Sequence, residues 1–210
     1  TIAPKLTIIS DNEKKHYISL IIYENSEFIV INKPSNIAVQ GGTKVKFSLK
    51  DIFESVLEIK LYLVHRIDKD TSGLIILSKD RFSAASISKL FLEKKIYKHY
   101  LAVTDNKFPK NNNFLVNTNN DNQVMRLRYR LIENVNSNFI YLVSLLTGRK
   151  HQIRLQFSLN KNPIINDIKF NRKMIKGNLG LCAYSIKFNY KNKFYSFKLQ
   201  YSKILKLFGF

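Results

Sequence analysis

Uninterrupted hydrophobic runs and alternating segments divide the chain into short predicted strands. The runs at 28–31 and 74–79 predict two buried strands, and Pro34 ends the first because proline lacks the N–H that a ladder needs. Further strands are predicted at 97–103, 114–118, 123–132 and 139–146, with a hairpin of 181–190 and 194–199. Strands dominate and do not alternate regularly with helices. We therefore expect an α+β fold with a largely antiparallel mixed sheet and flanking helices.

Helical spacing of apolar residues, together with capping residues, predicts the helices. Ser48 can cap a helix that runs to about Glu58, with Asp51 as its capping-box partner. Asp80 can cap a second helix over 81–95. Shorter helices are predicted at 151–159 and 202–208. Residues 1–20 carry little pattern, so we expect an N-terminal linker or arm of 1–20 before one domain of 21–210.

The predicted strand 123–132 alternates arginine with hydrophobic residues. This period of two places Arg126, Arg128 and Arg130 on one face of the sheet. That face is either solvated or turned towards a polyanion, and the pattern does not choose between the two.

The charge balance narrows the class of partner. The 210 residues carry 35 basic and 15 acidic side chains, a net charge of +20, which favours nucleic acid as a partner. Part of the lysine excess has another explanation, since a chain rich in Lys, Asn and Ile is typical of A- and T-rich codons. No apolar run is long enough to cross a bilayer, no signal-peptide pattern is present, and no segment pairs a basic face with an apolar one. We therefore expect a cytoplasmic protein that does not bind membranes.

The candidate chemistry centres on Asp68. This carboxylate follows Arg66 and precedes a Thr71-Ser72-Gly73 turn that leads into the aliphatic strand. A carboxylate on a turn held by a buried strand suits a nucleophile or a base, although such a turn is also ordinary at a protein surface.

Metal and cofactor patterns are missing from the sequence. The four histidines (His16, His65, His99 and His151) are scattered and lack zinc spacing, and no Walker or Rossmann glycine motif occurs. The single cysteine, Cys182, has apolar neighbours and is expected to be buried, so no disulfide can form within the chain. We expect neither a metal nor a cofactor.

Four motifs, in order, resemble the RluA-type pseudouridine synthases. Residues 65–79 are similar to the catalytic motif of that family, with Ile67 in place of leucine. Three other segments also resemble family motifs: Asn32-Lys33-Pro34-Ser35, the Lys98-x-Tyr100 strand, and Thr147-Gly148-Arg149-Lys150-His151-Gln152-Ile153-Arg154, followed by Pro163-Ile164 and Asp167. The resemblance implies the pseudouridine synthase fold with an RNA-binding cleft, and 21–210 as its catalytic domain.

Within the family, residues 37–42 resemble the RluC-like branch, which acts on large-subunit ribosomal RNA. Residues 1–4 resemble the linker that follows the S4 RNA-binding domain of that branch, a domain that these 210 residues do not include. The chain departs from the family at Gln156, Lys161-Asn162 and Cys182, which puts the RNA contacts and the substrate in question.

The resemblance also implies catalytic roles. Asp68 would be the covalent catalyst, or would abstract a proton to give a glycal-type intermediate; the sequence does not decide between these. Arg154 would keep Asp68 ionised, although a phosphate contact or a solvated position would also suit it. Tyr100 would stack on the flipped uracil and serve in proton removal from C5, although a lone strand tyrosine is usually core.

The remaining site residues are assigned to RNA contact or to support. Arg66 would fill the gap left by the flipped nucleotide, unless it forms a simple salt bridge, and Arg149 and Lys150 would hold phosphate. His65 and Lys98 complete the RNA-binding side, His65 as a hydrogen-bonding support. Residues that shape the turn or scaffold the site would be Thr71, Ser72, Gly73 and His151.

Two function classes compete. The first is a monomeric RNA-modifying isomerase that acts on large-subunit ribosomal RNA without an obligate protein partner. The second is a basic RNA-binding or ribosome-assembly protein without catalysis, which has no reason to place a buried carboxylate where RNA docks. A nuclease or glycosylase would need a metal cluster or a second carboxylate, and Asp70 is the only such neighbour in the motif.

Overall fold

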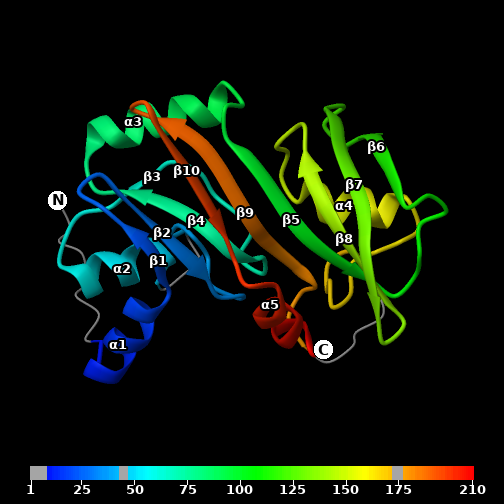
Figure 1. Cartoon of the computed structure of the whole chain (residues 1–210), viewed down its shortest axis with the longest axis horizontal. Coiled ribbons are helices and arrows are strands. Elements are labelled where there is room, and N and C mark those ends of the chain that lie inside the picture. Colours follow the sequence, from blue (N-terminus) through cyan, green and yellow to red (C-terminus); the bar gives the residue numbers. More distant parts are fainter. Residues whose placement is uncertain (1–8, 43–46, 172–176) are drawn as a thin grey trace.

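The computed structural model describes residues 9–42, 47–171 and 177–210. Their strands form one ten-stranded sheet in the order β1-β2-β4-β9-β5-β8-β7-β6, with β10 paired to β9 and β3 paired to β4 (Figure 1). Neighbouring strands are antiparallel except β4 and β9, which are parallel. The expected α+β fold with a largely antiparallel sheet is confirmed.

The predicted strands agree with the observed ones to within a few residues. The strands are β1 (Ile21–Glu24), β2 (Phe28–Lys33), β3 (Tyr62–Leu63), β4 (Ser72–Ser78), β5 (Tyr97–Thr104), β6 (Asn112–Thr118), β7 (Val124–Val135), β8 (Asn138–Leu145), β9 (Leu181–Tyr190) and β10 (Lys193–Lys198). The helices are α1 (Asp11–Ser19), α2 (Leu49–Leu57), α3 (Arg81–Leu92), α4 (Gln152–Leu159) and α5 (Tyr201–Phe208).

Capping residues set the helix ends as the sequence indicated. Ser48 and Asp51 form the predicted capping box of α2, and Asp80 caps α3 by accepting from the Ser83 amide. The α3 helix ends at Leu92 rather than at residue 95, because Lys94 adopts a left-handed φ of 56° and reverses the chain towards β5.

The sequence did not predict α1, and the reason is its lack of an apolar face. None of its residues is buried; Tyr17 packs edge-on against Phe53 of α2, and Lys14 pairs with Glu58 at the end of α2. A capping box was nevertheless present, formed by Ser10 and Glu13. The linker assigned to residues 1–4 lies outside the described residues.

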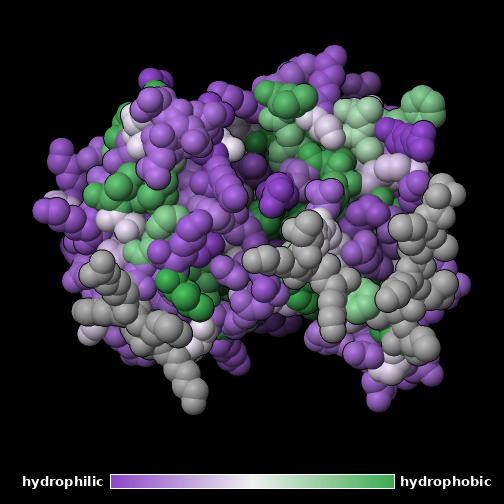
Figure 2. Space-filling view, turned by 180° about the vertical axis from the view of Figure 1, so that it is seen from behind, coloured by the Kyte–Doolittle hydropathy of each residue, from purple (hydrophilic) through white to green (hydrophobic). Residues whose placement is uncertain are grey.

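Both faces of the sheet are covered by helices. α1, α2 and α4 pack on the face that carries Tyr100, and α3 and α5 pack on the face that carries Leu101. In Figure 1, α1 and α2 lie at one end of the sheet and β6 and β7 at the other. Hydrophilic side chains cover most of the face seen from behind in Figure 2, with scattered hydrophobic patches. Among the described residues, no helix is both long and apolar enough to cross a membrane.

Gly73 is required where β4 meets β9. It pairs with Ala183 at a φ of +106°, and a Cβ at Gly73 would lie 2.4 Å from the Ala183 carbonyl oxygen. We expect Gly73→Ala to lower the free energy of unfolding by about 2–3 kcal/mol, because backbone atoms must move apart. Urea denaturation measures this loss.

Gly148→Ala is the matched control for Gly73→Ala, since no atom lies within 4 Å of a Cβ at Gly148. We expect a change within about 0.5 kcal/mol there. Equal stability of the two variants would contradict the steric argument.

Candidate active site

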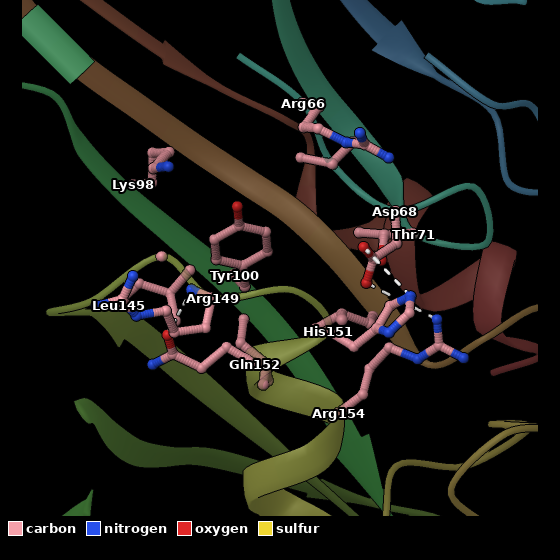
Figure 3. A pocket seen from close by; sticks show the side chains of 14 residues that line it. Arg66, Asp68, Thr71, Lys98, Tyr100, Leu145, Arg149, His151, Gln152 and Arg154 are labelled. Atoms are coloured by element: carbon pink, nitrogen blue, oxygen red, sulfur yellow. Dashed lines mark hydrogen bonds and ion pairs between the residues drawn. The ribbon is translucent and has the colours of Figure 1, made fainter. Parts of the chain in front are cut away.

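A pocket opens where the loop before β4, strand β5, the loop after β8 and helix α4 meet (Figure 3). Eight of the predicted site residues line it: Arg66, Asp68, Thr71, Lys98, Tyr100, Arg149, His151 and Arg154. These side chains come from segments that lie up to 88 positions apart in the sequence, between Arg66 and Arg154. The fold therefore brings most of the predicted site together.

The turn that carries Asp68 is held from within the protein. The Thr71 amide donates to the Asp68 carbonyl at 3.2 Å, which closes the turn. Beneath it, the buried Lys33 Nζ donates to the Lys69 carbonyl at 2.8 Å, and the Ser35 hydroxyl donates to the Asp70 carbonyl at 2.6 Å. Segment 33–35 thus fixes the backbone from which Asp68 projects, as a reactive group requires.

The Asp68 carboxylate lies between two cationic or ionisable groups. Arg154 Nη1 is 3.8 Å from Oδ2, and His151 Nε2 is 3.8 Å from Oδ1. The Asp68 side chain is 25% exposed, so it is reachable from the pocket although most of its surface is covered. Figure 3 shows both basic groups directed at this carboxylate.

Arg154 has a closer partner than Asp68. Its Nε and Nη2 donate to the two carboxylate oxygens of Asp167 at 2.8 and 2.7 Å, and the Asp167 side chain is fully buried. Its Nη1 also reaches Asp70 at 3.4 Å. The predicted pairing with Asp68 is therefore the longest of three contacts, and Asp167 holds the guanidinium in place.

Sequence reasoning noted Asp167 only as part of a motif and gave it no role. Its carboxylate also accepts from the backbone amides of Lys169 and Phe170, so it joins α4 to the following loop. A buried arginine needs such a partner, because an unpaired buried charge is costly. The sequence could therefore have indicated that Arg154 requires a carboxylate partner, but residue spacing alone did not identify which acid it is.

His151 supports the site from the N-terminus of α4. It is the N-cap residue and adopts a left-handed φ of 54°. Its Nδ1 lies 3.3 Å from the Lys169 ammonium. Burial lowers the pKa of His151, and the negative charge of Asp68 raises it. The positive charges of Lys169 and Arg154 lower it further. The imidazole is therefore mainly neutral at neutral pH, in keeping with a scaffold role.

Tyr100 and Lys98 face the same pocket from β5. Burial, and then the negative charge of Asp68, raise the pKa of the Tyr100 phenol well above its ordinary value. Burial also lowers the pKa of Lys98, whose ammonium lies 5.1 Å from the centre of the Phe91 ring. The phenol stays protonated at neutral pH.

His65 lies outside the pocket. Its Nε2 accepts from the Ile76 amide at 2.9 Å, and its ring stacks on Phe91 with centres 4.2 Å apart. Burial lowers the pKa of His65 well below its usual range, so the ring is neutral. The hydrogen-bonding support expected of this residue matches its position, and RNA contact by His65 stays a prediction.

The remaining predicted residues divide between surface and core. Lys150 is exposed beside the pocket without lining it, and Ser72 and Gly73 are built into the β4–β9 junction.

The loop before α4 is held by Gln152, whose side-chain oxygen accepts from the Thr147 hydroxyl at 2.8 Å and the Arg149 amide at 2.9 Å. This holds Arg149 at the rim.

Gln156, the departure noted next to the last motif, is fully buried away from the pocket. Its amide nitrogen donates to the carbonyls of Leu115 and Met125, so it ties α4 to β6 and β7. It contributes to packing and not to the pocket lining.

Lys33 gives the site a pH-dependent stability. Burial lowers its pKa to about 7 from 10.5, although the charges of Asp70 and Asp68 act to raise it. Between these two values the unfolded chain binds more protons than the folded chain, so stability rises with pH there and is lost as the pH falls towards 7. We therefore expect the free energy of unfolding to increase more steeply with pH in the natural chain than in Lys33→Met. The two slopes should differ by up to about 1.4 kcal/mol per pH unit.

Urea denaturation of both chains from pH 7.5 to 9.5 measures that difference. Groups that do not interact with Lys33 contribute equally to both curves and cancel. Parallel curves would show that Lys33 keeps its ordinary pKa when folded.

Comparisons with known proteins identify the family of the chain. Residues 27–159 match the family model described as RNA pseudouridylate synthase. The chain is 34% identical over 185 residues to ribosomal large subunit pseudouridine synthase C of Rickettsia prowazekii (strain Madrid E), an alignment covering 77% of this chain and 59% of that protein. It is 30% identical over 192 residues to the protein of the same name from Buchnera aphidicola subsp. Schizaphis graminum (strain Sg), covering 83% and 61%.

Solved structures share the fold at lower sequence identity. Human RNA pseudouridylate synthase domain containing 4 superposes with a TM-score of 0.74 at 20% identity, covering 89% of this chain and 90% of that one. Human RNA pseudouridylate synthase domain containing 1 gives 0.73 at 16%, covering 86% and 82%. The chain spans about three fifths of the length of the two bacterial relatives, 59% and 61%. With a family model matched over more than half of its residues, the chain belongs to the RNA pseudouridylate synthase family.

Proposed function

We propose that this chain is a pseudouridine synthase that isomerises uridine in large-subunit ribosomal RNA, with residues 21–210 as the catalytic domain. The observation that carries the proposal is the position of Asp68: a partly exposed carboxylate faces a pocket, with Arg154 and His151 each 3.8 Å away. The names of the bacterial relatives support the choice of RNA. We expect the chain to act as a monomer in the cytoplasm.

The reaction needs one carboxylate and no net change in atoms. The C1′–N1 bond of the nucleotide breaks, the base turns, and a C5–C1′ bond forms while the C5 proton is lost and N1 gains a proton. Asp68 either attacks C1′ or removes a proton from the ribose to give a glycal, and both routes use the same carboxylate. Arg154 stabilises its negative charge, and Asp167 keeps Arg154 oriented.

Tyr100 suits a stacking role beside that carboxylate. The phenol is buried in the pocket wall, and its raised pKa keeps the hydroxyl protonated at neutral pH. A protonated phenol is a poor base, which favours stacking on the uracil over removal of the C5 proton by a free phenolate.

The surrounding cations suit a flipped nucleotide. A uridine must leave its stack to reach Asp68, at a cost of a few kcal/mol. Arg66 is exposed at the pocket and can take the place of the extruded base, while Arg149 and Lys150 at the rim can hold phosphates.

The alternative is a basic RNA-binding or ribosome-assembly protein without catalysis. Incubating the purified chain with a transcript of large-subunit ribosomal RNA labelled with 5-tritiated uridine separates the two, because C5 loses its hydrogen when the C5–C1′ bond forms. We expect tritium release and pseudouridine in the digested RNA without any added cofactor. Tight binding with no release would favour the alternative.

A further inference from the structure

The outer face of the β6–β7 hairpin carries a cationic surface that has no part in the pocket. Three exposed arginines follow one another along β7 (Arg126, Arg128 and Arg130), and the exposed Phe114 and Val116 lie beside them on β6. We call these five residues the arginine strip. The alternation predicted for this strand is confirmed, since Met125, Leu127 and Tyr129 between the arginines are buried.

Strand register shows that the arginine strip faces away from the pocket. Tyr129 lies opposite Val143 of β8, and Val143 lies opposite Tyr100, so these three residues share the pocket side of the sheet. Arg128 pairs with Ser144 and therefore points to the other side. Helix α4 contacts β6 and β7 on the pocket side through Gln156, which leaves the strip uncovered.

The chemistry of the strip fits a polyanion. Among the described residues, no ion pair joins its arginines to a carboxylate. Arg128 donates from Nε to Asn112 Oδ1 at 3.3 Å and lies 5.7 Å from the centre of the Phe114 ring. Phe114 is 52% exposed, so its ring is free to stack. Alternate residues on a strand repeat every 6.8 Å or so, which lets the arginines meet successive phosphates of an extended strand.

One end of the strip adjoins, through its backbone, the loop that leads to the pocket rim. The Arg126 amide donates to the Thr147 hydroxyl at 2.8 Å, and the Arg126 carbonyl accepts from Gln152 at 3.0 Å. Thr147 begins the loop that carries Arg149 at the pocket. The backbone at Arg126 therefore adjoins the loop that carries Arg149, while the Arg126 side chain lies on the other face of the sheet.

We propose that the arginine strip is a second RNA-binding surface, which holds the phosphate backbone of the RNA that flanks the target uridine. The proposal rests on the proposed function for the identity of the partner. It adds a surface on the opposite side of the sheet, so a long RNA would wrap around the free edge at β6.

The test compares two triple variants that lose the same charge. Arg126→Gln/Arg128→Gln/Arg130→Gln removes the strip, and Lys15→Gln/Lys60→Gln/Arg81→Gln removes three exposed cations near α1, α2 and the start of α3. Binding is measured to a long fragment of ribosomal RNA and to a short stem-loop that reaches only the pocket, at several salt concentrations.

For the long RNA we expect the strip variant to bind about tenfold more weakly or worse, with a salt slope smaller by about 2–3, since each phosphate contact contributes about 0.9. The control should lose less than about threefold. Changing the three arginines to lysine keeps the charge and should restore most of the affinity.

Equal losses in the two triple variants, or no loss in the strip variant, would overturn the proposal. Failure of the natural chain to bind RNA would also overturn it. The same holds if the strip variant binds anionic lipid vesicles more weakly than the natural chain but binds RNA equally well. Binding is scored without turnover. A natural chain that binds RNA but makes no pseudouridine would therefore refute the proposed function and leave the strip to be judged on binding alone.

Discussion

Asp68→Asn is expected to abolish pseudouridine formation while RNA binding is kept. Asparagine fills the same space but can neither attack C1′ as a carboxylate nor act as a base. On either route, loss of the reacting carboxylate lowers the rate by about 10⁴-fold or more. RNA binding should stay the same or tighten slightly, because one negative charge facing the phosphates is removed. Tritium release from labelled ribosomal RNA measures the first effect, and filter binding measures the second.

Asp70→Asn is the matched control for Asp68→Asn. Asp70 lies two positions away on the same turn, its side chain is 42% exposed, and it also contacts Arg154, at 3.4 Å. We expect most activity to remain in this variant, because Asp68 keeps its place. Full activity of Asp68→Asn would show that the chemistry is carried by another group.

Asp167→Asn is expected to destabilise the protein by about 3–5 kcal/mol and to lower activity with it. The change leaves the buried guanidinium of Arg154 without its bidentate partner, and only the longer contacts to Asp70 and Asp68 then compensate its charge, which is costly. The freed guanidinium can turn towards Asp68 or Asp70, so its orientation in the site is lost as well. Urea denaturation measures the stability, and tritium release at a temperature where the variant is folded measures the activity.

The double variant Arg154→Gln/Asp167→Asn separates the two consequences. It removes both charges, so stability should recover in part, while activity should not, because Asp68 has lost Arg154. If the double variant were no more stable than Asp167→Asn alone, the loss would come from packing at residue 167 and not from an unpaired charge.

Much of the fold was readable from local pattern. Period-two alternation and aliphatic runs identified most strands, because all strands except β1 and β3 contain buried residues. Ser48 and Asp80 marked helix starts by a local hydrogen bond. Helix α1 was missed because it buries no residue, and a helix without a buried face lacks the periodic apolar residues by which helices are predicted.

The site was predictable as a set of residues but not as a set of contacts. The motif resemblance selected Asp68, Tyr100 and Arg154, and the fold brings all three to one pocket. It did not identify Asp167 as the close partner of Arg154, and it did not show that the His65 ring stacks on Phe91 outside the pocket lining.

The amino-acid sequence alone was sufficient for the strand pattern, the capped helix starts, the charge that favours RNA and the turn that presents Asp68, because each depends on neighbours a few positions apart. Only the folded chain decided which carboxylate holds Arg154, how Lys33 supports the Asp68 turn, and that the arginines of β7 lie on the side of the sheet away from Tyr100. Alternation shows that three side chains share a face, but the order and register of strands distant in sequence decide what that face meets.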